Sequence, residues 1–218
     1  MKTIIFDLGG VIADLKTKEA FRAFAEKGLP VPPELYNSSG VLNGVPSEMP
    51  MLSMIHRMDL GEITGEQFLG MVQSQCRPGT TYEELLHAYN DLIEVPRHRL
   101  EMLCNLRKTH QVFLLSNIGD LHWEKFRDVC SESGITVDDC FDRMYLSYQL
   151  RMAKPDPRIF EHLIADSGID PTEALYIDDF IDNIRAGEAA GLNTFHIEGN
   201  TLDERMEEIK LKAGHAKA

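Results

Sequence analysis

Six polar side chains have types and positions that could do chemistry. Five of them lie at or just beyond the ends of apolar segments, and the sixth lies just before a predicted helix. They are Asp7, Ser116, Asn117, Lys154, Asp178 and Asp179. The carboxyl ends of the strands in an open parallel sheet meet at one edge, and ligands bind at that edge. We therefore expect these side chains to converge, although they lie far apart in the chain.

The three carboxylates of this group indicate a divalent cation. Asp178 and Asp179 are adjacent, and with Asp7 beside them they would repel one another unless a cation lay among them. Ligands that are all oxygens suit Mg²⁺ better than they suit the transition metals. The carboxylates therefore predict a magnesium site.

The remaining polar groups indicate a small anion such as phosphate. The hydroxyl of Ser116 and the amide of Asn117 suit phosphate oxygens, and Lys154 supplies a point positive charge. The pair Gly9-Gly10 directly follows the first apolar segment, so the backbone there can approach an anion closely.

The elements that must position these groups are short, nearly continuous apolar runs separated by helical patterns. Such runs are typical of parallel strands that are covered on both faces. They lie at residues 3–8, 111–116, 143–148, 174–178 and 193–197. Helical patterns occupy 156–168 and 180–191, and Thr201-x-x-Glu204 predicts a capping box that opens a last amphipathic helix. The alternation predicts a doubly wound, Rossmann-like α/β sheet.

Residues 15–92 interrupt this alternation, because they contain no strand candidate. Two capping boxes, Thr64-x-x-Gln67 and Thr81-x-x-Glu84, predict helices there. We expect an α/β core formed by 1–14 and 95–218, with 15–94 inserted as an all-helical cap over the edge where the polar groups meet. Met51, Met54 and Met58 fall on one face of a helix and are expected to form the interior of this cap.

Composition excludes several classes of protein. Acidic residues outnumber basic ones by 35 to 22, which gives a formal net charge of −13 and disfavours binding to nucleic acid or to anionic membranes. No apolar run approaches the ~20 residues of a membrane span, and Asp7 interrupts the apolar start too early for a signal peptide. The four cysteines form no Cys-x-x-Cys pair. We expect a cytoplasmic protein with free thiols; the sequence indicates no oligomeric state.

Four segments resemble, in order, the motifs of the haloacid dehalogenase-like hydrolase superfamily. They are Phe-Asp-Leu-Gly-Gly-Val at 6–11, Leu-Leu-Ser-Asn at 114–117, Lys-Pro-Asp-Pro-Arg-Ile-Phe at 154–160 and Ile-Asp-Asp-Phe-Ile-Asp-Asn at 177–183. Gly61-Glu62-Ile63-Thr64 resembles a segment that recurs in the helical cap of the family's first subclass. The resemblance covers essentially the whole chain.

The resemblance implies a phosphatase that acts on a small phosphorylated metabolite. Asp7 would be the nucleophile that takes the phosphoryl group as an aspartyl-phosphate, which water then hydrolyses. Mg²⁺ would bind Asp7, the backbone carbonyl of Gly9 and Asp179, with Asp178 as a further ligand or as a partner of a ligand.

By the same resemblance, Ser116 and Lys154 would hold the phosphate oxygens. Most phosphatases of the family carry a second Asp where this chain has Gly9, and that Asp acts as general acid and base. The family branch that shares the Asp-Leu-Gly pattern resembles glucose-1-phosphate phosphatases, so a sugar phosphate is one candidate substrate. Asp14 either replaces the missing acid or, more simply, caps the first helix of the insert.

Three alternative functions stay open from the sequence. A 2-haloacid dehalogenase would use Asp7 on carbon without metal, but such enzymes have Tyr where this chain has Phe160 and lack the paired acids. A mutase would need the acid that Gly9 replaces. A non-catalytic phosphate-metabolite binding protein would explain Gly9 but not the retention of Asp7, Lys154 and Asp179. His122 and Trp123 either line the pocket or lie on a helix surface.

Overall fold

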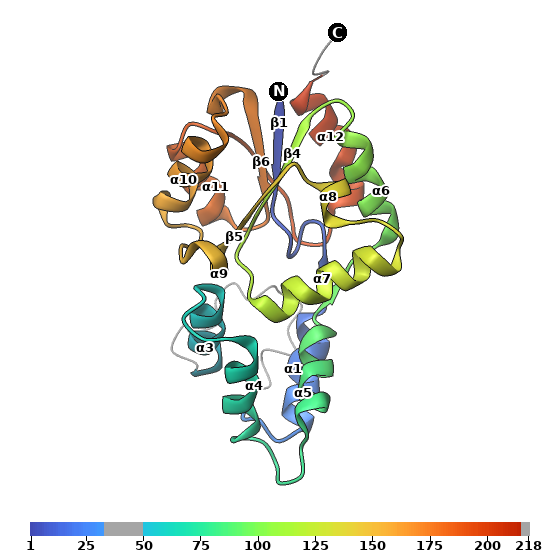
Figure 1. Cartoon of the computed structure of the whole chain (residues 1–218), viewed down its shortest axis with the longest axis vertical. Coiled ribbons are helices and arrows are strands. Elements are labelled where there is room, and N and C mark those ends of the chain that lie inside the picture. Colours follow the sequence, from blue (N-terminus) through green and yellow to red (C-terminus); the bar gives the residue numbers. More distant parts are fainter. Residues whose placement is uncertain (33–49, 215–218) are drawn as a thin grey trace.

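The computed structural model describes residues 1–32 and 50–214, so residues 33–49 of the expected cap lie outside the described residues. Its centre is a five-stranded parallel sheet in the order β5-β4-β1-β6-β7 (Figure 1). The strands are β1 (Thr3–Phe6), β4 (Gln111–Ser116), β5 (Arg143–Leu146), β6 (Ala174–Asp178) and β7 (Asn193–His196).

Strand β1 lies in the middle of this sheet, and all four of its residues are buried. Its last residue, Phe6, pairs with Leu114 of β4 and Ile177 of β6. The backbone N–H of Asp7 then donates to the carbonyl of Ile177 at 3.0 Å. This register places Asp7 at the carboxyl edge, between the ends of β4 and β6.

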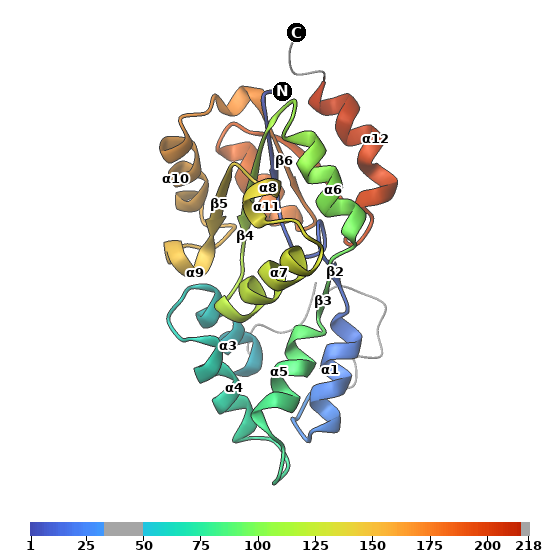
Figure 2. The same ribbon diagram turned by 45° about the vertical axis from the view of Figure 1, so that its right-hand side comes forward.

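Helices cover both faces of the sheet, as the apolar runs predict. Side chains alternate along β1: Ile4 and Phe6 belong to one hydrophobic cluster, and Ile5 belongs to the other. The first face packs against α6 (Arg97–Leu106), α7 (Asp120–Glu132), α8 (Val137–Cys140) and α12 (Leu202–Ala213), and the second against α10 (Pro157–Ser167) and α11 (Ile181–Ala189) (Figures 1 and 2). The doubly wound α/β fold is therefore confirmed.

The described part of the insert forms helices that lie together beyond the carboxyl edge of the sheet (Figure 2). These helices are α1 (Thr17–Glu26), α3 (Pro50–Asp59), α4 (Gly65–Gln73) and α5 (Tyr82–Asn90). Their apolar faces form a separate hydrophobic cluster, which includes Phe68, Met51 and Met58, with Met54 packed against it. The insert thus has an interior of its own.

A two-stranded antiparallel ribbon, which the sequence did not predict, joins the insert to the rest of the chain. Its strands are β2 (Asp14–Leu15) and β3 (Ile93–Glu94). Because the ribbon includes residues 15, 93 and 94, the expectation that 15–94 is all-helical is wrong at both ends of the insert. Two residues per strand are too few to produce a recognisable pattern of apolar and polar positions. Asp14 does not cap α1, as was expected, because its carboxylate accepts a hydrogen bond from Arg99 at 2.7 Å and lies in β2.

Two of the three expected capping boxes are confirmed. Thr64 with Gln67, and Thr81 with Glu84, make both reciprocal hydrogen bonds. The box expected at Thr201 is wrong, because the Thr201 hydroxyl donates to the carbonyl of Glu198 instead of accepting from the helix. Helix α12 still buries Leu202, Met206 and Ile209, as its pattern predicts.

The insert packs closely against the α/β core at two glycines. A Cβ at Gly65 of α4 would collide with the side chain of Leu121, and the backbone N–H of Gly65 donates to Asp120 at 2.9 Å. A Cβ at Gly61 would collide with the carbonyl oxygen of Tyr148 in α9 (Ser147–Leu150). Glycine at these two positions therefore allows the backbones of the insert to approach the core closely.

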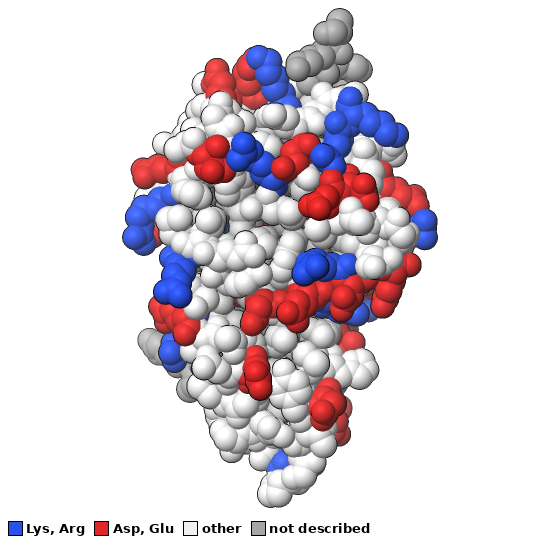
Figure 3. Space-filling view, viewed as in Figure 1, with Lys and Arg blue, Asp and Glu red and all other residues white. Residues whose placement is uncertain are grey.

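The surface is acidic near this junction. Helix α7 carries Asp120, Glu124, Asp128 and Glu132 at intervals of four residues, and Figure 3 shows a belt of acidic side chains at the level of that helix. Such a surface repels polyanions. No helix within 1–32 and 50–214 is long and apolar enough to cross a membrane.

Candidate active site

Lys154 lies at the centre of the polar group. Its Nζ is 2.9 Å from Oδ1 of Asp7 and 2.7 Å from Oδ2 of Asp178, and its side chain is only 1% exposed. Burial acts to lower the pKa of Lys154, but Asp178 and Asp7 outweigh it and raise this pKa above its usual value. Lys154 is therefore a permanent cation between two carboxylates.

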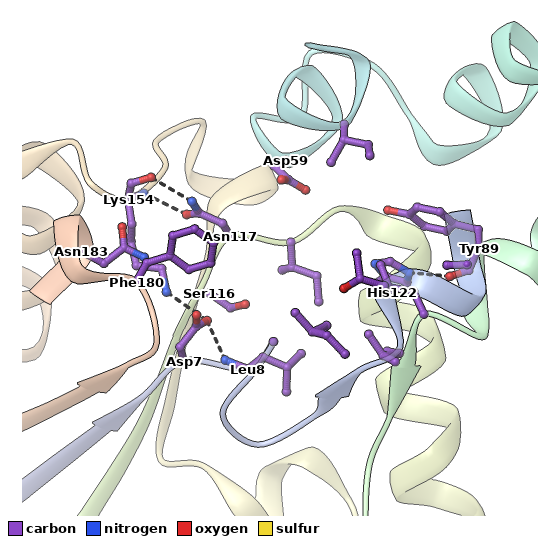
Figure 4. A pocket seen from close by; sticks show the side chains of 18 of the residues that line it. Asp7, Leu8, Asp59, Tyr89, Ser116, Asn117, His122, Lys154, Phe180 and Asn183 are labelled. Atoms are coloured by element: carbon purple, nitrogen blue, oxygen red, sulfur yellow. Dashed lines mark hydrogen bonds and ion pairs between the residues drawn. The ribbon is translucent and has the colours of Figure 1, made fainter. Parts of the chain in front are cut away.

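Asn117 fixes the backbone that carries Lys154. The Asn117 amide nitrogen donates to the carbonyl of Lys154, and the N–H of Lys154 donates to the Asn117 amide oxygen, both at 2.8 Å. The sequence predicted that this amide contacts phosphate. In the structure these amide atoms instead position Lys154, while Ser116 lies beside Asp7 at the base of the pocket (Figure 4).

The two adjacent aspartates have different surroundings. Both carboxylate oxygens of Asp178 are engaged, by Lys154, the hydroxyl of Tyr176, the amide of Asn183 and the N–H of Phe180. Oδ1 of Asp179, by contrast, is buried and has no hydrogen-bond partner. A buried carboxylate oxygen without a donor is costly, so the surroundings of Asp179 fit an oxygen ligand for a cation.

The charges fit a divalent cation. Ligand oxygens of Asp7, Asp178 and Asp179 lie within 4.8 Å of one another. Burial raises the pKa of Asp7 to about 6 against the opposing effect of Lys154, and burial, with Asp7 and Asp178, raises the pKa of Asp179 to about 8. Three carboxylates and one ammonium leave a net charge of −2 when all are ionised, which one Mg²⁺ would neutralise.

These raised pKa values predict how stability depends on pH. Between the unfolded and folded pKa values, the folded protein binds more protons than the unfolded chain, so its free energy of unfolding should fall as pH rises from 5 to 8. Mg²⁺ should flatten this decline, because it favours the ionised carboxylates. Melting temperatures at pH 5, 6, 7 and 8, in chelator and in Mg²⁺, test both trends. A Mg²⁺-induced stabilisation that does not grow with pH would contradict the assignment.

Gly9 and Gly10, which follow Asp7, differ in whether their positions could carry a side chain. Gly10 has φ +75°, and a Cβ there would lie 2.8 Å from Cγ of Asp179, so only glycine fits. A Cβ at Gly9 would meet Leu15 Cδ2 at 3.5 Å, an ordinary contact. The backbone thus does not require glycine at position 9. Most phosphatases of the family that this chain resembles carry an acid at this position.

A cavity of about 460 Å³ lies between the sheet edge and the insert. Asp7, Ser116 and Lys154 line its base, and apolar side chains of the insert line much of the opposite side (Figure 4). These apolar residues are Ala20, Phe21, Phe24, Met51, Ile55 and Phe68.

Sequence reasoning missed one carboxylate in this cavity. Asp59, the last residue of α3, is half-buried and lines the cavity across from Asp7 (Figure 4). Burial, and then the charge of Asp7, raise the pKa of Asp59 to about 7. One sequence feature could have pointed to Asp59. It is the single acid of a methionine-rich helix, and it lies just before the Gly61–Thr64 segment that resembles part of the family's cap.

His122 connects the core to the insert. Its ring stacks on Tyr89 of α5 with centroids 3.9 Å apart, and its Nε2 donates to the carbonyl of Tyr89 at 2.9 Å. Burial lowers the pKa of His122 to about 4, so the ring is neutral. Of the two alternatives, pocket lining is confirmed for His122, which lines the cavity. Neither alternative holds for Trp123, which is buried in the core.

Comparisons with known proteins indicate one family. A sequence model of the haloacid dehalogenase-like hydrolase family matches residues 1–191. The chain is 33% identical to the D-ribitol-5-phosphate phosphatase of Bacteroides thetaiotaomicron, over 95% of this chain and 96% of that protein.

Solved structures are similar over nearly the same length. A haloacid dehalogenase family enzyme of Bacteroides thetaiotaomicron, in complex with magnesium and inorganic phosphate, has a TM-score of 0.76 and 29% identity, covering 92% of this chain and 96% of that one. A predicted hydrolase of the same family from Porphyromonas gingivalis has a TM-score of 0.75 and 27% identity, covering 96% and 98%. The chain, with its matched motifs and its sheet order, belongs to the haloacid dehalogenase-like hydrolase family.

Proposed function

We propose that this protein is a Mg²⁺-dependent phosphatase that hydrolyses a small phosphorylated metabolite, of the sugar or sugar-alcohol phosphate class. One observation carries the proposal: Asp7 lies at the base of a cavity, bonded to the buried Lys154, and beside an Asp179 oxygen that has no partner. The ribitol-phosphate phosphatase and the neighbouring structure with magnesium and phosphate support it.

Asp7 is the proposed nucleophile, which takes the phosphoryl group as an aspartyl-phosphate. Asp7, Asp179 and the carbonyl of Gly9 are the proposed ligands of Mg²⁺, which when bound neutralises charge between the nucleophile and the phosphate. Asp178, whose oxygens already accept several hydrogen bonds, orients Lys154.

Lys154 and Ser116 are the proposed contacts to the phosphate oxygens. Because Lys154 is held by two carboxylates and by Asn117, its ammonium group is in place before the substrate arrives. Such preorganisation reduces the cost of binding a phosphate dianion.

We also propose that residues 15–94 act as a cap that sets substrate specificity, over a core formed by 1–14 and 95–218. The cavity between them supports this division, because its base is polar and its insert side is largely apolar. A small metabolite fits its volume, whereas the acidic surface disfavours nucleic acid and anionic membranes. The free cysteines fit a reducing, cytoplasmic setting.

The test is phosphate release from a panel of phosphate monoesters that includes D-ribitol 5-phosphate, with Mg²⁺ and with excess chelator. Removing the metal should lower the rate by about 10³-fold or more, since a bound cation contributes several kcal/mol of charge stabilisation. In the same preparation, 2-chloropropionate should release no chloride, because the carboxylates repel that substrate and Phe160 is packed in the core against Tyr176.

Unchanged turnover in chelator would contradict the metal requirement. Steady chloride release that is lost in an Asp7 variant would favour the dehalogenase alternative.

A further inference from the structure

The chain has glycine at position 9, so the acid that protonates the leaving group must come from elsewhere. Phosphoryl transfer places the attacking and leaving oxygens roughly in line. If Asp7 attacks from the base of the cavity, the leaving oxygen faces away from Asp7, toward the insert. The carboxyl group of Asp59 lies on that side (Figure 4).

The other described titratable side chains that line the cavity are unsuited to this role. They are Asp7, Tyr89, His122, Lys154 and Asp182. Lys154 is paired with two carboxylates, His122 is neutral and already donates to Tyr89, and the pKa of Tyr89 is raised well above 10 by burial and by Asp59. Asp182 is exposed and paired with Arg185.

Asp59 differs from these groups in its contacts with the described residues that line the cavity. None of the interactions drawn in Figure 4 ends on its carboxylate, so its proton is not committed to a neighbour shown there. Burial, and then the facing charge of Asp7, raise the pKa of Asp59 to about 7, so part of the protein carries a proton on Asp59 at neutral pH. A protonated carboxyl that faces the leaving group is what general acid catalysis requires.

We propose that Asp59, supplied by the insert, is the general acid and base of the reaction. It takes the place of the Asp that most phosphatases of the family carry where this chain has Gly9. This role rests on the proposed phosphatase function. In the first step, the Asp7 carboxylate forms a bond to phosphorus, the bond to the ester oxygen breaks, and Asp59 gives its proton to that oxygen, releasing the alcohol.

In the second step, water attacks the phosphorus from the side that the alcohol has left. Asp59, now a carboxylate, takes a proton from this water as the oxygen–phosphorus bond forms. The bond between phosphorus and Asp7 breaks, which releases phosphate and restores the Asp7 carboxylate and the Asp59 carboxyl. One proton leaves Asp59 and one returns in each cycle.

The test compares Asp59→Asn with the unchanged protein on two substrates in Mg²⁺. An alkyl phosphate has a poor leaving group, and its kcat/KM should fall by about 10²-fold or more, within the ~10²–10⁴ that general acids contribute. p-Nitrophenyl phosphate needs little protonation, so its rate of aspartyl-phosphate formation, measured as the nitrophenolate burst, should change by less than about 10-fold.

The pH profile gives a second readout. With the alkyl phosphate, kcat/KM of the unchanged protein should decline as pH rises through the raised pKa of Asp59, because the acid loses its proton. Asp59→Asn should lack this decline. A residue that only shapes the cap would lower the rate without removing that limb of the profile.

Two further variants complete the design. Glu62→Gln is the matched control, because Glu62 is an exposed acid near Asp59 that pairs with Arg57 and does not line the cavity; its activity should be unchanged. Adding Gly9→Asp to Asp59→Asn should restore at least 10-fold of the lost activity on the alkyl phosphate, since position 9 has room for a side chain.

The outcomes are distinguishable. Equal losses on both substrates, or no loss on either, would overturn the role of Asp59 while leaving the phosphatase function standing. If the unchanged protein with Mg²⁺ hydrolyses no phosphate ester, including p-nitrophenyl phosphate, the proposed function fails and the role of Asp59 fails with it.

Discussion

Replacing Asp7 with asparagine should lower kcat by at least about 10⁴-fold on every phosphate ester, because an amide is a poor nucleophile and carries no charge for the metal. The loss should be as large with p-nitrophenyl phosphate as with an alkyl phosphate, in contrast to the Asp59 variant. Phosphate release in Mg²⁺ gives the rates, and mass spectrometry of acid-quenched protein should detect the phosphorylated form only when Asp7 is present.

The fold should survive this change. The asparagine oxygen can still accept from the N–H of Leu8 and from Lys154, as the Asp7 carboxylate does at 2.6 and 2.9 Å. Burial also disfavours the charged form of Asp7, so the variant in chelator should unfold at a temperature no lower than that of the unchanged protein. Asp91→Asn, on the exposed pair with His87, serves as the control. Turnover by Asp7→Asn close to the original rate would remove Asp7 from the mechanism.

Replacing Lys154 with methionine should produce the largest loss of stability. The change leaves Asp7 and Asp178 buried side by side with no cation, and breaking a buried pair in this way costs about 3–5 kcal/mol. Urea unfolding in chelator measures the loss, and Mg²⁺ should recover part of it by neutralising the same carboxylates. Phosphatase activity should also fall, because a contact to phosphate is gone.

Lys16→Met is the matched control for this experiment. It removes an ion pair with Glu94 whose side chains are 47% and 58% exposed, and exposed pairs contribute about 0–1 kcal/mol. If Lys154→Met in chelator unfolds at the same urea concentration as Lys16→Met, the ammonium group is not what holds the two carboxylates together.

The sheet and the convergence of its polar strand ends were predictable because both follow from strong local signals. Buried parallel strands give continuous apolar runs, and the run at 174–178 coincides with β6. Once the strands are parallel, geometry brings Asp7 and Asp178 to the same edge of the sheet. Lys154 follows α9 and is positioned there by its hydrogen bonds to Asn117. The assignment of roles to these side chains stays a prediction.

The features that the sequence could not give depend on partners that are distant in the chain. Asp178 and Asp179 are chemically identical, and only the bonds from Tyr176, Asn183 and Phe180 show which one is already satisfied. The sequence could not show that His122 is buried, because its ring is covered by Tyr89 of the distant insert. Asp59 reads as the end of a helix until the insert folds over the sheet and turns that end toward Asp7.

The close approach of Gly61 and Gly65 to the core has a consequence for how such enzymes diverge. These contacts fix the end of the insert that carries Asp59, whereas Phe21, Phe24 and Ile55 line the cavity from other turns of its helices. Substitutions at those apolar positions can reshape the space for the alcohol without moving the carboxyl. Substrate specificity can therefore change in evolution while the positions of the proposed catalytic residues stay the same.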